Sequence, residues 1–329
     1  MSIDNDPIAE LAHAALGPFG LGPGATVTLC NVSENHTYRV EDGAGERSYA
    51  LRVHRPGYRS LEEIRSELVW MDALGADGVV RPPRALAAAD GSRVVSVSTA
   101  GLAPRHVVVF EWLDGVAPDL DAGEAATRQF EILGATSARM HGHVGVWDHP
   151  ADFRRPRWDY DTTIGPLGHW GLWQDGLGIG PEERRQLGRL DATIAARLQA
   201  FGEWPERFGL IHADMRLANL LVDAGQVHVI DFDDCGFSWY MYDFATAVSF
   251  IEDHPRVPEL RDAWVAGYRS VRELEPAAEA ELETFVMLRR LLLVAWIGSH
   301  HTFAPEAAEL GAGFTAGTCA LAEDYLSTH

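Results

Sequence analysis

The stretch LIHADMRLANLLVDAGQVHVIDFDDCG, residues 210–236, organises the rest of the chain. It begins with a short apolar run, 210–211, which predicts a buried strand that ends in a polar loop. Two further mainly apolar runs, 220–222 and 227–230, flank Asp-Ala-Gly at 223–225, which is typical of a β-hairpin with glycine in its turn. The stretch is therefore predicted to fold as strand, loop and hairpin.

The hairpin brings three oxygen-bearing side chains together. Asn219 precedes the first strand of the hairpin and Asp231 follows the second, so both are expected at its open end, near Asp214 of the preceding loop. Carboxylate and carboxamide oxygens are the ligands that Mg²⁺ prefers. Asn219 and Asp231 are thus predicted to hold Mg²⁺, and Asp214 to receive a proton from a hydroxyl group. For any one of these residues alone, a hairpin with surface acids is the alternative.

The spacing H-x-D-x-x-x-x-N at 212–219, followed by I-D at 230–231, resembles the catalytic loop and metal-binding aspartate of the protein-kinase-like fold. The variants H-A-D and I-D-F-D resemble the aminoglycoside phosphotransferase and choline kinase family, most closely its homoserine-kinase-type and stress-response-kinase branch. The resemblance implies an α+β fold of two lobes. These are an antiparallel-sheet, nucleotide-binding lobe at 1–110, a hinge at 111–116, and a mainly helical lobe with the catalytic loop and acceptor pocket at 117–329.

Composition narrows the class of protein. The formal net charge of the 329 residues is −21, which argues against nucleic acids and anionic membranes as partners. All 27 basic residues are arginine, so a GxxxxGK[ST] phosphate loop and Schiff-base chemistry are excluded. Three scattered cysteines without a CxxC motif favour neither a disulfide framework nor a zinc site. With no basic N-terminal segment and no apolar run long enough to span a bilayer, a cytoplasmic location is expected.

An ion pair is predicted in the nucleotide-binding lobe. Its strands are expected at 25–31, 36–41, 48–54, 92–98 and 105–111, and its helices at 6–16 and 60–75. Glu67 lies in the apolar stripe of the second helix, where a carboxylate needs a cation, and Arg52 on the preceding strand can supply one. Related kinases have a lysine at this strand position, paired with the helix glutamate and the nucleotide phosphates. Arginine keeps the charge and adds donors enough for both.

The family resemblance assigns further parts of the nucleotide site. The segment between the first two strands corresponds to the loop over the ATP phosphates; it lacks glycine, so Ser33 and Asn35 are expected to supply donors, and a polar hairpin turn is the alternative. In the hinge sequence FEWLDG, the backbone C=O of Phe110 and N–H of Trp112 are expected to meet the adenine edge. Arg216 of the catalytic loop is expected to neutralise the transferring phosphate, with a solvated surface arginine as the alternative.

The second lobe is predicted to hold the acceptor. Helices are expected at 122–141, 181–201, 258–270, 276–300 and 305–326, with another that begins in WYMYDFATAV at 239–248. The irregular, aromatic-rich segment 143–180, with Trp170 and Trp173, is predicted to form a wall of the acceptor pocket, or else a packed excursion. His300 is a candidate to face the acceptor. Asp233 is expected to assist the metal or an acceptor amine.

Two more aspartates receive structural roles. The resemblance implies that Asp243 is buried and braces the metal loop, and Asp234 is also expected to be structural. The whole pattern predicts ATP- and Mg²⁺-dependent transfer of the γ-phosphoryl group to a hydroxyl of a small, amine-bearing molecule, either an amino alcohol or an aminoglycoside-like compound. A Ser/Thr protein or peptide kinase is the alternative. A nucleotide-binding pseudokinase is disfavoured, because all three core polar residues are present. The acceptor's identity, the choice of ATP or GTP and the oligomeric state are not predicted.

Overall fold

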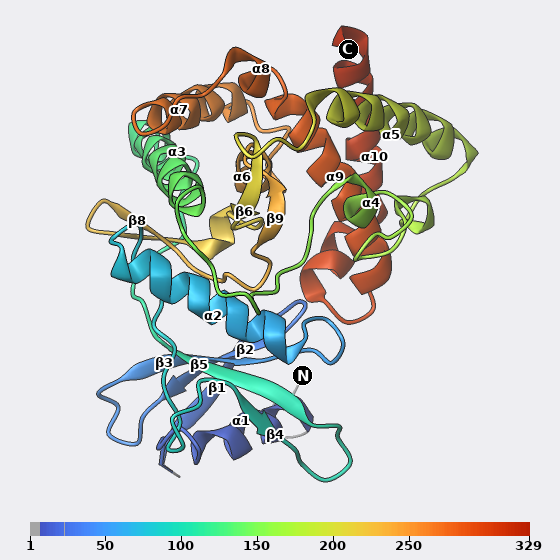
Figure 1. Cartoon of the computed structure of the whole chain (residues 1–329). Coiled ribbons are helices and arrows are strands. Elements are labelled where there is room, and N and C mark those ends of the chain that lie inside the picture. Colours follow the sequence, from blue (N-terminus) through green and yellow to red (C-terminus); the bar gives the residue numbers. More distant parts are fainter. Residues whose placement is uncertain (1–6, 23) are drawn as a thin grey trace.

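The computed structural model describes residues 7–22 and 24–329. It has two lobes, one built on a sheet and one mainly helical (Figure 1). The sheet is antiparallel, in the order β1-β2-β3-β5-β4. Its strands are β1 Thr26–Val32, β2 His36–Glu41, β3 Ser48–Val53, β4 Val95–Val97 and β5 Arg105–Glu111. The predicted strands are confirmed, although β4 is much shorter than expected.

Two helices cover the two faces of this sheet. The helix α1, Pro7–Leu16, packs on the outer face with a small core of its own. The helix α2, Leu61–Ala76, lies between the sheet and the helical lobe (Figure 1). The predicted capping box at its start is confirmed: Ser60 Oγ accepts from the Glu63 N–H at 3.2 Å, and the Glu63 carboxylate accepts from the Ser60 N–H at 2.8 Å. These two bonds satisfy N–H groups that a helix start leaves unpaired.

The second lobe is mainly helical, as predicted. Its helices are α3 Glu124–Val144, α4 Tyr160–Thr163, α5 Pro181–Phe201, α6 Tyr242–Ala247, α7 Val257–Arg269, α8 Pro276–Glu279, α9 Leu282–His300 and α10 Pro305–Thr328. The segment 143–180 is largely irregular, apart from α4 and the 3₁₀-helix η2, Trp173–Asp175. Throughout the described residues, no helix is both long enough and apolar enough to cross a membrane.

Two sequence predictions for this lobe are wrong in detail. The expected single helix 276–300 is divided into α8 and α9. The expected helix at 239–248 begins only at Tyr242, because residues 236–239 form a strand, β9, that pairs with β6, Phe208–Ile211. The partner strand lies more than twenty residues earlier in the chain, so local periodicity gave no sign of it.

The hairpin that carries the site is formed as predicted. Its strands are β7, Leu220–Asp223, and β8, Gln226–Val229. Ala224 and Gly225 both have positive φ, 47° and 80°, as a two-residue type I′ turn requires. The Ile230 N–H donates to the Asn219 carbonyl at 2.9 Å. Asn219 therefore lies next to the residue that precedes Asp231.

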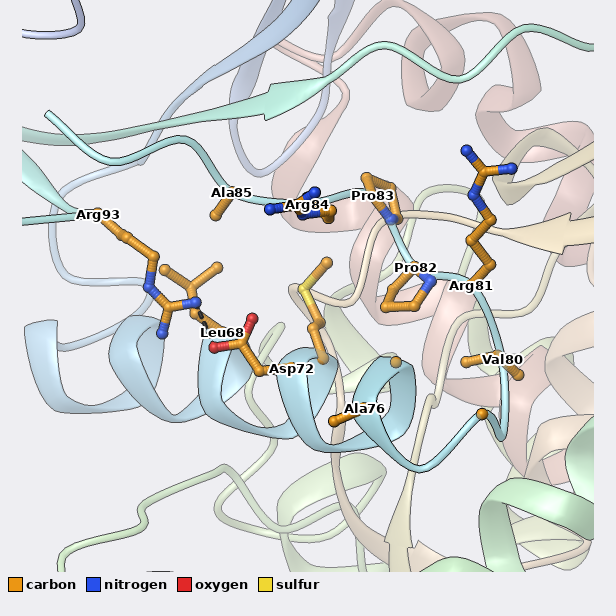
Figure 2. A pocket seen from close by; sticks show the side chains of 13 residues that line it. Leu68, Asp72, Ala76, Val80, Arg81, Pro82, Pro83, Arg84, Ala85 and Arg93 are labelled. Atoms are coloured by element: carbon orange, nitrogen blue, oxygen red, sulfur yellow. Dashed lines mark hydrogen bonds and ion pairs between the residues drawn. The ribbon is translucent and has the colours of Figure 1, made fainter.

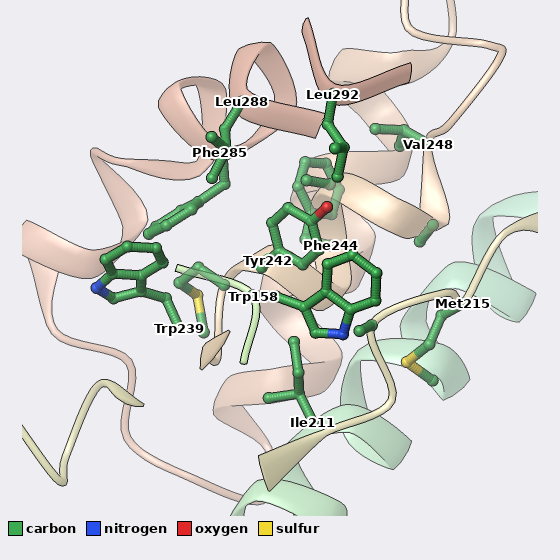
Figure 3. Close-up of a cluster of buried hydrophobic side chains, with 14 of the residues drawn as sticks. Trp158, Ile211, Met215, Trp239, Tyr242, Phe244, Val248, Phe285, Leu288 and Leu292 are labelled. Atoms are coloured by element: carbon green, nitrogen blue, oxygen red, sulfur yellow. The ribbon is translucent and has the colours of Figure 1, made fainter. Parts of the chain in front are cut away.

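The helix α9 is the centre of the helical lobe. Its residues 287–297 are buried without a break, and Leu288 and Leu292 contribute to the apolar cluster of Figure 3 together with Trp239 and Phe285. A helix with apolar residues around most of its circumference is stable in water only when other elements cover it. The core of this lobe therefore fixes α9 beside the catalytic loop.

The helices α3 and α7 approach each other closely through two glycines. A Cβ atom placed on Gly134 would lie 1.9 Å from the carbonyl oxygen of Trp264, and one placed on Gly267 would lie 1.8 Å from that of Glu131. Neither contact can be relieved by a side-chain rotation, because both involve backbone atoms. Only glycine is compatible with this helix separation.

Gly134→Ala is therefore expected to destabilise the protein by about 1–3 kcal/mol, the usual cost of overpacking. Gly142→Ala is the matched control, because it lies on the same helix and its Cβ would have no atom within 4 Å. The control is expected to stabilise by up to about 1 kcal/mol, since alanine is the better helix former. Urea denaturation measures both. Equal free energies of unfolding for the two variants would contradict the close approach.

Candidate active site

Two adjoining cavities lie where the lobes meet. The larger, about 280 Å³, has an apolar lining from both lobes that includes Ala50, Met71, Phe110, Leu113 and Leu221. The smaller, about 60 Å³, contains Asp214 and is lined by polar and aromatic side chains. Asn31, Asn219 and Asp231 line both cavities. A molecule in the larger cavity can therefore reach a molecule in the smaller one past the predicted metal ligands.

Asp214 is held on both sides. Its Oδ2 accepts from Asn219 Nδ2 at 2.7 Å, and its Oδ1 accepts from Arg289 Nη2 at 2.6 Å. Burial raises the pKa of Asp214, an effect that Arg289 and Arg216 oppose. Sequence analysis missed Arg289. The available signal was its position, because two successive arginines, 289 and 290, interrupt an otherwise apolar helix.

The catalytic loop is braced from beneath by Asp243. Its Oδ1 accepts from the Ala213 N–H at 2.8 Å, and its Oδ2 meets His141 Nε2 at 2.9 Å. Ala213 has a φ of 64°, a conformation that a residue other than glycine holds only when its surroundings enforce it. The expected burial of Asp243 is confirmed, and the loop that it braces directly is the catalytic loop.

The predicted pair of Arg52 and Glu67 is confirmed. Arg52 Nη2 lies 2.5 Å from Glu67 Oε1, and Glu67 is fully buried. Arg52 Nη1 also lies 3.0 Å from Asp231 Oδ1 and 3.8 Å from Asp233 Oδ1. Burial alone would lower the pKa of Arg52, but these three carboxylates outweigh it and raise that pKa above its ordinary value. One guanidinium thus joins α2 to the loop after β8.

Asp231 and Asn219 present oxygens suited to a divalent cation. Burial raises the pKa of Asp231 to about 6 despite Arg52, and three nearby aspartates add to the shift. A cation would relieve that repulsion. Both N–H···O contacts of the Asn219 carboxamide go to Asp214, which leaves its carbonyl oxygen free to bind a metal. Among the described residues no group of three or more His, Cys, Asp or Glu could hold a metal.

The other residues predicted to bind the nucleotide differ in whether they face a cavity. Ser33 lines the smaller cavity, and Phe110 the larger. Asn35 instead faces inward: its Nδ2 donates to Asp233 Oδ2 at 2.8 Å, so it braces the loop and is not aimed at the phosphates. The N–H of Trp112 donates to the Ser48 carbonyl at 3.3 Å. The expectation that this N–H meets adenine is therefore not supported.

The residues predicted to contact the acceptor also differ in whether they line the smaller cavity. Trp170 lines the smaller cavity, whereas Trp173 is buried elsewhere and donates from Nε1 to Asp191 at 3.0 Å. His300 does not line the cavity, but its Nε2 pairs with Glu34, which does.

The two aspartates of the metal loop lie in the opposite positions from those expected. Asp233 is buried behind the site, between Asn35 and Arg52, and the opposing arginines hold its pKa below the ordinary range although burial would raise it. Asp234 is the one that lines the cavity. Arg216 lines it too, paired with Glu306 at 2.9 Å.

A third cavity, larger than these two, lies away from Asp214. It measures about 580 Å³ and runs between α2 and the segment 80–85, with Arg81, Arg84 and Arg93 around it (Figure 2). Met71 and Pro83 line both this cavity and the larger of the two active-site cavities. It contains none of the predicted site residues.

Known proteins share this architecture. The model of the phosphotransferase enzyme family matches residues 28–282. Amicoumacin kinase of Bacillus subtilis (strain 168) is 24% identical over 298 residues, 86% of this chain and 83% of the relative. An uncharacterized protein of Deinococcus radiodurans is 30% identical over 80% of this chain and 75% of the relative.

Solved structures are similar over almost the full length. The structure described as the microcompartment-associated aminopropanol kinase has a TM-score of 0.88 and 48% sequence identity, over 97% of this chain and 98% of that chain. An amicoumacin kinase in complex with AMP-PNP, Ca²⁺ and its ligand has a TM-score of 0.75 and 22% identity, over 95% and 93% of the two chains. At that identity the second likeness shows the two-lobed fold alone.

Arg52→Met is expected to lower the free energy of unfolding by about 3–5 kcal/mol, because it leaves the buried Glu67 carboxylate without a partner. The double variant Arg52→Met/Glu67→Leu is expected to regain most of that stability but to bind Mg-ATP no better than the single variant. Denaturation and calorimetry measure the two effects separately. If the double variant is as unstable as the single one, the pair does not contribute as described.

Proposed function

We propose that this chain, which belongs to the phosphotransferase enzyme family, transfers the γ-phosphoryl group of ATP to the hydroxyl of a small amino alcohol. The chain is a phosphotransferase with an alcohol group as acceptor. The observation that carries the narrower proposal is the size and lining of the cavity beside Asp214. At about 60 Å³ it is far smaller than the roughly 300–1,000 Å³ of pockets that hold drug-sized ligands.

The residues that line that cavity favour the binding of a positively charged acceptor. Four carboxylates and two guanidiniums line it, together with the aromatic rings of Trp170, Phe250 and Trp296. Carboxylates neutralise an ammonium group, and aromatic rings pack against a short hydrocarbon chain or a cation. The 48% identical structure described as an aminopropanol kinase supports the same class of acceptor. A cavity of this size favours a small acceptor over an aminoglycoside-sized one.

The residues of the site divide the work of the transfer. Asp214 orients the acceptor hydroxyl and takes its proton, while Arg289 and Asn219 keep the carboxylate in place. Asn219 and Asp231 would hold Mg²⁺, which supplies charge neutralisation at the phosphates. Arg52 provides a further positive charge at the boundary of the two cavities. Arg216 faces the same cavity and can approach the transferred group.

The larger cavity is suited to the nucleotide. Its apolar lining can enclose an adenine ring, and Leu113 lines it one residue beyond Trp112, so we assign the contact with the adenine edge to the backbone of Leu113. The end of β5 at Glu111 supports a hinge at 111–116 between lobes at 1–110 and 117–329. Because ATP is an intracellular cosubstrate, we propose that the protein acts in the cytoplasm.

A panel of acceptors tests this proposal. ADP release from Mg-ATP is measured with 1-amino-2-propanol, ethanolamine, choline, an aminoglycoside and a generic protein substrate. We expect the highest kcat/KM for an amino alcohol of two to four carbons. Turnover only with the aminoglycoside, or labelled phosphate only in protein, would overturn the proposal and favour the other acceptor class.

Asp214→Asn is expected to lower kcat by about 10²–10⁴-fold, the usual range for a lost acid–base group, with nearly unchanged Mg-ATP binding. Asp148→Asn is the control, since Asp148 is exposed and lines neither cavity. Steady-state kinetics with the best acceptor of the panel and calorimetry with Mg-ATP measure the two properties. A variant that keeps near-normal kcat would exclude Asp214 as the base.

A further inference from the structure

The acceptor cavity offers four carboxylates for an ammonium group, and they are not equivalent. These are Glu34, Asp214, Asp231 and Asp234. A carboxylate oxygen that already accepts hydrogen bonds from cationic groups has little left to offer a further cation. The partners of each carboxylate therefore decide which of them can bind the acceptor's amine.

Two of the four carboxylates already have a part in the proposed phosphoryl transfer. Asp214 accepts from Arg289 on one oxygen and from Asn219 on the other, and it faces the hydroxyl that reacts. Asp231 accepts from Arg52 and lies at the predicted metal position. Neither is available to hold a group at the far end of the acceptor.

Glu34 offers no open oxygen on the side of His300. Its Oε2 accepts from Arg55 Nη1 at 3.0 Å, and its Oε1 is buried against His300 Nε2 without a hydrogen bond. These contacts join the loop between β1 and β2 to the end of α9. The arrangement makes Glu34 a link between the lobes that closes one side of the cavity.

Asp234 is the exception. Its Oδ1 accepts from the Tyr58 hydroxyl at 2.5 Å and from Arg59 Nη2 at 2.7 Å. For its Oδ2, the described part of the chain supplies no hydrogen-bond or ion-pair partner. One oxygen thus fixes the carboxylate, and the other is free on the side chain that lines the cavity.

The position of Asp234 is also rigid. Its backbone carbonyl accepts from Trp158 Nε1 at 2.8 Å, and the carbonyl of the neighbouring Asp233 accepts from Arg59 Nε at 3.1 Å. Tyr58 and Arg59 belong to the segment between β3 and α2, whereas Trp158 belongs to the aromatic segment of the other lobe. A carboxylate held from both lobes presents its free oxygen without a further cost of ordering.

The ring of Trp170 and the carboxylate of Asp214 line the same 60 Å³ cavity as Asp234. In a space of that size, a molecule whose hydroxyl meets Asp214 keeps its amine within a few bonds of the other groups that line the cavity. We propose that Asp234 binds the ammonium group of the acceptor and sets the preference for amino alcohols over neutral alcohols. This inference rests on the proposed function and names the residue that carries its specificity.

The test compares two acceptors that differ in one group. 1-Amino-2-propanol and 1,2-propanediol present the same hydroxyl, with and without the ammonium. We expect Asp234→Asn to lower the ratio of kcat/KM for the amine to kcat/KM for the diol by on the order of 10- to 100-fold, as for a lost hydrogen bond to a charged group. An unchanged circular dichroism spectrum and an unchanged KM for ATP show that the variant is folded.

The variant Glu34→Gln tests whether Glu34 is rightly excluded as the ligand of the ammonium group. Because one oxygen of Glu34 accepts from Arg55 and the other is buried, this change should reduce the ratio much less than Asp234→Asn, and the exposed Asp148→Asn should leave it at the wild-type value. An unchanged ratio in Asp234→Asn, or a larger loss in Glu34→Gln, would overturn the assignment. Failure of the proposed function looks different, since the wild type would then phosphorylate no amino alcohol, and the assignment would fall with it.

Discussion

The buried guanidinium of Arg52 is the interaction on which the site depends. It lies near the end of β3 with almost no exposure and pairs with Glu67 of α2 and Asp231 of the metal loop. A charge in such a place is tolerated only when partners surround it. The partners come from both lobes, so the requirement to satisfy one cation also fixes the distance between the sheet, α2 and the hairpin. In a chain without lysine, the fork of arginine makes this shared contact possible.

A second set of polar contacts fixes the loops themselves. Asp243 accepts two N–H groups of the catalytic loop and holds Ala213 at a positive φ. Arg155 donates to the backbone carbonyls of Asp233 and Cys235 in the metal loop. Each loop therefore has its backbone hydrogen bonds satisfied by a buried side chain from another element, which is how irregular backbone stays ordered in an interior. These contacts therefore fix the positions of the carboxylates that the two loops carry.

The acceptor space is small because bulky elements close it. The segment 143–180 contributes Trp170, and the buried part of α9 contributes Arg289, Leu293 and Trp296. The same segment also donates hydrogen bonds to the metal loop from Trp158 and Arg155. This long irregular segment therefore both lines the cavity and holds the metal loop in place. The packing of the helical lobe thus determines the size of the cavity beside Asp214.

The sequence by itself predicted most of the elements and the three polar side chains that meet beside the hairpin. Local patterns predicted the hairpin, the capped helix α2, the pair of Arg52 and Glu67, and the meeting of Asp214, Asn219 and Asp231, because each rests on short spacing or on periodicity. Only the tertiary structure decided that Arg289 holds Asp214 and that Asp234 rather than Asp233 lines the cavity. Neighbouring aspartates look alike in a sequence, and which one faces the site depends on partners contributed by distant segments of the chain. A cavity's volume, likewise, exists only after the lobes have packed.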